Sequence, residues 1–102
     1  MLLCLSLLPL TGAASSRVRE AMRRGDIMPL TPVLEWLERY YHGQTIDVEL
    51  EEQQGALIYQ VEWLSPTGEV LDFSFDAASG EFLEVRGRGI VEARREPDEM
   101  GR

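Results

Sequence analysis

Acidic and large apolar residues alternate along the middle of the chain. Residues 45–84 include ten Asp and Glu residues and no Lys or Arg. Apolar side chains interleave with the first acids at Ile46, Val48 and Leu50, and the same alternation returns at residues 71–75. Alternation with a period of two is typical of a strand with one buried and one solvated face, because successive side chains point to opposite sides. The segment therefore predicts an antiparallel sheet whose solvent-facing side is almost wholly negative.

Short turn sequences divide this segment into four predicted strands. We expect them at Thr45–Glu52, Ala56–Leu64, Glu69–Phe75 and Glu81–Arg86. Connections this short make each neighbouring pair antiparallel, so the strands form a meander. The side chains expected on the inner face are Ile46, Val48, Leu50, Leu57, Tyr59, Val61, Trp63, Leu71, Phe73, Phe75, Leu83 and Val85.

Two helices are predicted ahead of the sheet. The first is short and spans Ser16–Arg24, and the second runs from Thr31 toward Gly43 with Pro32 in its first turn. Apolar residues recur in the second helix at spacings of three and four, which forms one stripe that we expect to cover the inner face of the sheet. The predicted fold class is α+β, with this helix packed across a four-stranded antiparallel meander and preceded by a short N-terminal helix.

The two ends of the chain differ in composition from its middle. Residues 1–14 contain a short apolar run followed by Gly12 and Ala14 at the spacing of a cleavage site, and we interpret them as a signal peptide. Their first part has no basic residue, so a start further upstream and a buried N-terminal element stay open as alternatives. The folded domain is then expected at 15–86. Residues 87–102, rich in Gly and charged residues, are expected to be a disordered tail.

Composition and motifs argue against several classes of function. Eighteen acidic and ten basic residues give a net charge of −8, which repels phosphate backbones and excludes nucleic-acid partners. The serines lack a Gly-x-Ser-x-Gly context, His42 is the sole histidine, and the sole cysteine, Cys4, lies in the predicted signal peptide. We therefore expect no enzyme, no cofactor and no metal site. After signal cleavage we expect a periplasmic or secreted protein with no membrane span.

Three segments resemble the PepSY domain family. The turn Asp76–Glu81 with the following strand Phe82–Val85 resembles the closing strand pair of that family. Tyr59–Glu62 is similar to the aromatic element of the preceding strand, and Ile27–Leu30 to the segment before the helix in small exported members. Together the similarity covers residues 17–86. PepSY domains occur in the propeptides of thermolysin-type proteases and modulate peptidase activity, so the resemblance implies a non-catalytic module with a peptidase or sensor protein as its partner.

A partner surface is expected at the edge formed by the first strand. Unpaired backbone groups at such an edge are a template for another chain, and nearby acids favour a basic segment. The candidate partner-binding residues are Trp36, Tyr40, His42, Asp47, Glu49 and Glu51. The alternative is a weak cation or small-ligand binding domain that uses the acidic sheet face. The sequence leaves the oligomeric state open.

Overall fold

A computed structural model of the chain describes residues 15–96. The predicted signal peptide at 1–14 lies outside the described residues, as do residues 97–102. The described elements are, in order, α2 (Ser15–Arg24), α3 (Thr31–Tyr40), β1 (Gln44–Gln53), β2 (Ala56–Leu64), β3 (Val70–Asp76), β4 (Phe82–Arg86) and α4 (Ile90–Ala93).

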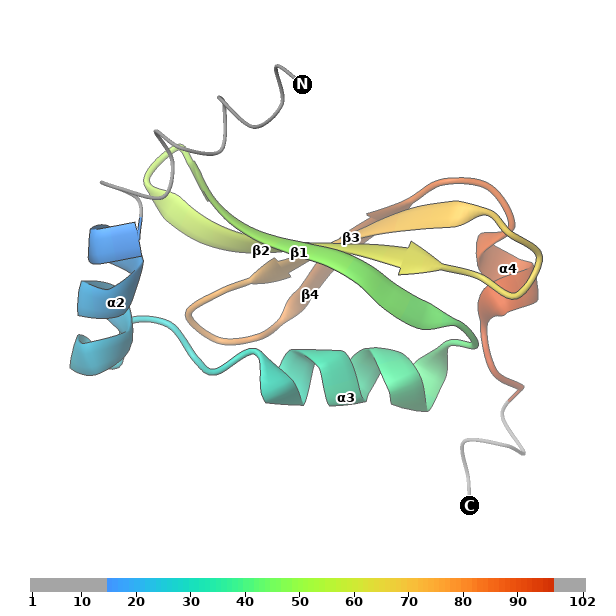
Figure 1. Cartoon of the computed structure of the whole chain (residues 1–102), viewed down its shortest axis with the longest axis horizontal. Coiled ribbons are helices and arrows are strands. Elements are labelled where there is room, and N and C mark those ends of the chain that lie inside the picture. Colours follow the sequence, from blue (N-terminus) through green and yellow to red (C-terminus); the bar gives the residue numbers. More distant parts are fainter. Residues whose placement is uncertain (1–14, 97–102) are drawn as a thin grey trace.

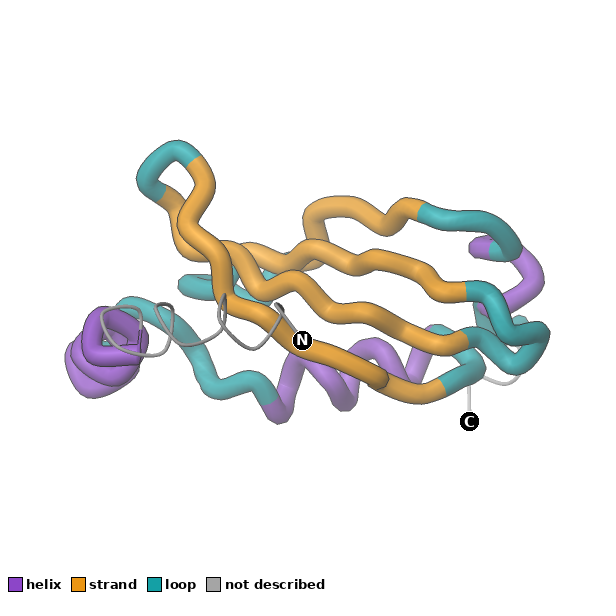
Figure 2. The backbone as a smooth tube through the Cα atoms, turned by 45° about the horizontal axis from the view of Figure 1, so that its top comes forward, coloured by secondary structure: helices purple, strands orange, loops and turns teal. Residues whose placement is uncertain are grey.

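The strands form one sheet in the order β1-β2-β3-β4, and each neighbouring pair is antiparallel. Helix α3 runs along one face of this sheet, whereas α2 lies beyond one end of it (Figure 1). Seen from another angle, the backbone shows two layers, with α3 beneath the strands (Figure 2). The predicted α+β fold class, an antiparallel meander covered by a helix, is therefore confirmed.

The core lies between α3 and the inner face of the sheet. Trp63, Phe73 and Phe75 are completely buried there, together with Leu37 from the helix. The Tyr41 ring packs edge to face on Phe73 with 4.8 Å between ring centroids, and the rings of Phe73 and Phe75 are stacked. The inner-face positions predicted for β2 and β3 from their alternating pattern are occupied as expected, because both strands are paired on both sides and run without interruption.

Two β-bulges overturn part of the predicted inner face. One lies between Thr45 and Asp47, so that Ile46 is the extra residue and is 46% exposed. The other makes Leu83 the extra residue of β4, 48% exposed, and places Phe82 opposite Phe75. The predictions that Ile46 and Leu83 face the core are therefore wrong. A bulge adds one residue to one strand only, so alternation in that strand's sequence no longer reports which face a side chain occupies.

The segment between α2 and α3 is held against the sheet by hydrogen bonds at Met28. Its backbone N–H donates to the carbonyl of Ala77 at 2.8 Å, and the Tyr59 hydroxyl donates to the Met28 carbonyl at 2.7 Å. Gly80 in the turn between β3 and β4 has a φ of +80°, and any side chain at that position would overlap the Met28 sulfur. These contacts place the start of α3 over the sheet.

The chain after β4 is ordered as far as the structure describes it. The carbonyl of Ala93, which is buried, accepts a hydrogen bond from the N–H of His42 at 2.7 Å, and the N–H of Arg95 donates to the carbonyl of Tyr40 at 2.9 Å. The prediction of a disordered tail is therefore wrong for residues 87–96. Composition could not reveal that this short segment pairs its backbone with the end of α3.

Candidate functional site

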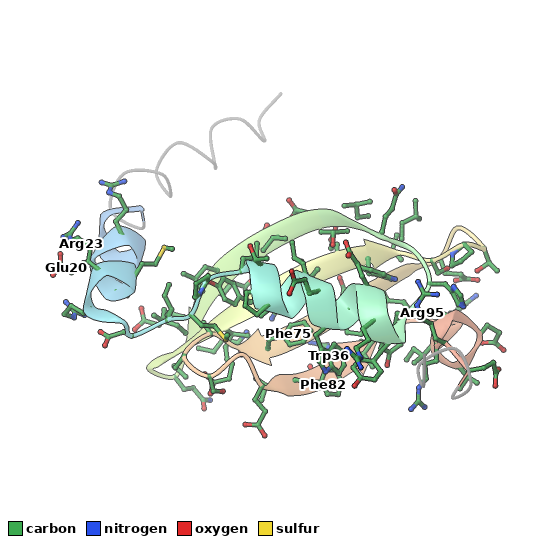
Figure 3. All side chains as sticks on the ribbon, turned by 90° about the horizontal axis from the view of Figure 1, so that it is seen from below. Glu20, Arg23, Trp36, Phe75, Phe82 and Arg95 are labelled. Atoms are coloured by element: carbon green, nitrogen blue, oxygen red, sulfur yellow. The ribbon has the colours of Figure 1, made fainter. Side chains whose placement is uncertain are left out.

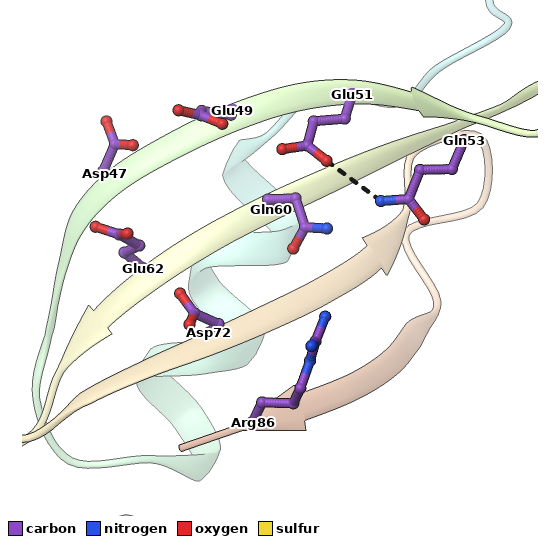
Figure 4. Close-up of a pocket in the computed structure, with 8 residues that line it drawn as sticks. All are labelled: Asp47, Glu49, Glu51, Gln53, Gln60, Glu62, Asp72 and Arg86. Atoms are coloured by element: carbon purple, nitrogen blue, oxygen red, sulfur yellow. Dashed lines mark hydrogen bonds between the residues drawn. The ribbon is translucent and has the colours of Figure 1, made fainter. Parts of the chain in front are cut away.

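The acidic side chains gather on the face of the sheet turned away from α3. One cross-strand row runs over all four strands, with Asp47 opposite Glu62, Glu62 opposite Asp72, and Asp72 opposite Arg86. This row belongs to a shallow hollow (Figure 4), which we call the acidic hollow. Its lining residues are Asp47, Glu49, Glu51, Gln53, Gln60, Glu62, Asp72 and Arg86. The hollow therefore presents five carboxylates and one guanidinium group.

A second cross-strand row is less charged at its centre. It places Glu49 opposite Gln60, Gln60 opposite Ser74, and Ser74 opposite Glu84. The Ser74 hydroxyl is buried and donates a hydrogen bond to the Gln60 side-chain oxygen at 2.8 Å. This pair satisfies two polar groups on the two central strands. The carboxylates of the hollow are thus concentrated on β1, which contributes three of the five, with one each from β2 and β3.

Glu49 lies among the other carboxylates of the hollow. Desolvation by its surroundings raises the pKa of Glu49, and contact with Glu51 and the negative charges of Asp47 and Glu62 raise it further. The side-chain amide of Gln53 donates to Glu51 at 3.2 Å, which offsets a little of this negative charge. A positively charged group entering the hollow would relieve the repulsion, so the hollow favours a cationic ligand.

Strand β1 is also an edge of the sheet. Among residues 15–96 it pairs with β2 alone, so its other side presents unpaired backbone groups beside the acidic hollow. The bulge at Ile46 leaves one large apolar side chain exposed on the same strand. The unpaired backbone groups of this edge can bind an extended chain, and the acidic side chains beside it favour a chain that is basic.

The aromatic candidates lie elsewhere. Trp36 projects from α3 and stacks on Phe82 of β4, with 5.4 Å between ring centroids, so it is close to the opposite edge of the sheet (Figure 3). The ring of Tyr40 packs against that of Trp36, with 5.0 Å between ring centroids. His42, at the end of α3, lies with its Nδ1 3.1 Å from a guanidinium nitrogen of Arg95.

The structure therefore divides the predicted partner-binding residues into two groups. The three acidic candidates on β1 lie together in the hollow, and the three candidates from α3 and its end lie on the other side of the sheet or beyond it. Sequence reasoning missed Gln53, Gln60 and Arg86 as lining residues. For Gln60 and Arg86 a signal existed. Their signal was the cross-strand register, which aligns Arg86 with Asp72 and Gln60 with Glu49.

Asp76 has a structural role in the turn between β3 and β4. Its side-chain oxygen accepts hydrogen bonds from the backbone N–H of Ala78 at 2.8 Å and of Ser79 at 3.3 Å. The carboxylate thereby stabilises the turn between β3 and β4, as expected for an Asp at the start of such a turn.

Within the described part of the chain, no three His, Cys, Asp or Glu side chains are grouped so that they could hold a metal ion. None of the helices in residues 15–96 has the length and apolar character needed to cross a membrane.

Comparison with known protein families identifies a family that matches this chain. The sequence model of the PepSY family, described as the peptidase propeptide and YPEB domain, matches residues 30–86. The match begins just before α3 and ends with β4, so it covers the helix and the complete sheet. Neither a curated protein nor a solved structure matches the chain significantly.

Proposed function

Because this chain belongs to the PepSY family, we propose that it is a non-catalytic, extracytoplasmic module that binds a peptidase or a sensor protein and modulates its activity. The family description, which names a peptidase propeptide, supports the choice of partner. A propeptide acts by contact with its enzyme, so a domain of this kind needs a docking surface rather than a catalytic cleft.

The acidic hollow is the observation that carries the docking proposal. Its five carboxylates face solvent beside the open edge of β1, and the partner contributes an extended basic segment that pairs with this edge. Of the candidate residues, we retain Asp47, Glu49 and Glu51 as partner-binding. Trp36 and Tyr40 are not retained, because they pack together toward the opposite edge of the sheet, and His42 is not retained, because its ring lies against the Arg95 guanidinium.

Capture of the partner by the purified protein tests this proposal. The variant carrying Glu49→Lys and Glu51→Lys is expected to retain at most about a tenth of the partner that the unchanged protein captures from an envelope extract, because each attraction becomes a repulsion. A matched control carries Glu35→Lys and Glu92→Lys, two exposed positions on α3 and α4, and has the same net charge. The control should capture the partner normally. Equal capture by both variants would rule out the hollow.

The proposed location follows from the family and from the predicted signal peptide at residues 1–14. The mature protein then begins near Ser15 outside the cytoplasm. N-terminal sequencing of fractionated protein tests this location, and an intact Met1 on cytosolic material would overturn it.

Weak cation binding by the acidic face is the second candidate function. We favour a protein partner because the carboxylates are spread over three strands and, in residues 15–96, no group of them converges on one point. Excess calcium is therefore expected to leave the melting temperature unchanged. A ligand at a hundred times its dissociation constant would instead add about 2.7 kcal/mol of stability.

A further inference from the structure

Strand β4 is the other edge of the sheet, and its charges differ from those of β1. Among the described residues it pairs with β3 alone. Its regular part, after the bulge at Leu83, contains Glu84, Val85 and Arg86. Glu84 and Arg86 are two residues apart and therefore project from the same face, where they form an ion pair within the strand, with Arg86 Nε 3.2 Å from Glu84 Oε2. Their side chains are 53% and 74% exposed, so solvent screens this pair and both groups stay accessible to a second copy. The edge thus offers one negative and one positive group in a fixed order.

This order is self-complementary. When two identical strands pair antiparallel about a central residue, the residue before the centre of one strand faces the residue after the centre of the other. With Val85 at the centre, Glu84 of each copy faces Arg86 of the other. We propose that two copies of this chain associate through antiparallel pairing of their β4 strands about Val85, which joins the two sheets into one.

Apolar groups along β4 support a second copy as the occupant. Phe82 is 37% exposed although it stacks on Trp36, and Leu83 is 48% exposed. Both side chains lie at the strand that the second copy would contact, and Figure 3 shows Trp36 and Phe82 next to each other at that strand. In the proposed register Leu83 faces Gly87 of the other copy, which has no side chain to obstruct it. The contact would cover apolar surface that a single copy leaves in water.

Strand β1 cannot serve the same purpose. It contains four acidic residues and no basic one, so antiparallel pairing of two β1 strands would bring carboxylates close to carboxylates. The charge patterns therefore suit β4 to a second copy and β1 to a basic partner, and Arg86 lies where the two surfaces adjoin. The β4 contact involves only about five residues from each chain, so we expect a weak, concentration-dependent dimer.

Charge exchange on β4 gives a sharp test by analytical ultracentrifugation, from low micromolar concentration to about 1 mM. The unchanged protein should form dimers. Either Glu84→Arg alone or Arg86→Glu alone should raise the dimer dissociation constant at least about tenfold, since each leaves like charges facing one another. An equimolar mixture of these two variants should form a heterodimer, because every facing pair is then of opposite charge. One chain carrying both substitutions should dimerise again.

Controls separate the β4 contact from general charge effects. Glu35→Arg on the exposed side of α3 changes the net charge as much as Glu84→Arg and should leave dimerisation intact. Circular dichroism should show the same fold for all variants, because the substituted side chains are exposed. A protein that stays monomeric up to about 1 mM overturns the proposal. So does a mixture of the two single variants that forms no heterodimer, or a single variant that dimerises as strongly as the unchanged protein.

Discussion

At the scale of single residues, Glu49 shows how the acidic hollow affects stability. Its pKa is raised by desolvation and by the neighbouring carboxylates, so the folded protein holds a proton there at higher pH than the unfolded chain does. A raised carboxyl pKa means that unfolding releases a proton in the pH range between the two pKa values. The folded state is therefore favoured below the ordinary pKa of 4.5, and this advantage is lost as the pH rises through the raised value.

Replacing Glu49→Gln should consequently stabilise the domain at pH 7, by about 0.2–0.5 kcal/mol, because solvent screens charges at an exposed site. The gain should disappear below about pH 4, where the carboxyl group is protonated in both states. Thermal unfolding at a series of pH values measures both effects. The control is Glu35→Gln on the exposed side of α3, which removes the same charge far from the hollow. Identical pH profiles for the two variants would contradict the account.

At the scale of elements, the bulge in β4 decides which side chain completes the core. It brings Phe82 opposite Phe75 and under Trp36, with the rings of Trp36 and Phe82 only 16° from parallel. Leu83, the next residue, is left on the surface. Because of the extra residue, Phe82 rather than Leu83 lies on the inner face of the sheet. Phe82 thereby packs against Trp36 and Phe75 at this edge of the sheet.

Two alanine substitutions test the bulge. Phe82→Ala should cost about 1–2 kcal/mol in free energy of unfolding, because it removes a partly buried ring and its stacking contact. Leu83→Ala should cost less than about 0.5 kcal/mol, as is usual for exposed positions. Urea denaturation at low protein concentration, where β4 has no second copy beside it, measures both. If Leu83→Ala lost more free energy of unfolding than Phe82→Ala, the bulge would be contradicted and a register without it would be favoured.

The regularity of each strand decides how well its side-chain positions could be predicted from the sequence. Alternation placed the residues of β2 and β3 correctly because both strands are regular and paired on both sides. It failed at Ile46 and Leu83, where a bulge adds a residue without a local sequence signal. The acidic half of the site was predictable from β1 alone. Trp36 was misplaced because the packing of α3, rather than its sequence, determines which sheet edge the ring meets.

At the scale of the whole molecule, the sheet separates two kinds of surface. Helix α3 covers the inner face and makes the core, and the outer face carries the acidic hollow (Figures 1 and 4). Arg95 caps the C-terminal end of α3. Its side-chain Nε donates a hydrogen bond to the Glu38 carbonyl, and its backbone N–H donates to the Tyr40 carbonyl. The folded unit thus continues past the residues that match the family, while the proposed partner surface lies within them.

The central claim is that a basic partner docks on the outer face beside β1, and NMR mapping tests it most directly. An arginine-rich peptide titrated into the isotope-labelled protein should shift backbone amide signals of β1, the outward-facing positions of β2 and Asp72, and these shifts should weaken as salt is added. Signals of α3 should stay in place. Shifts that centre on α3 and Trp36, or no shifts at low salt, would contradict the account.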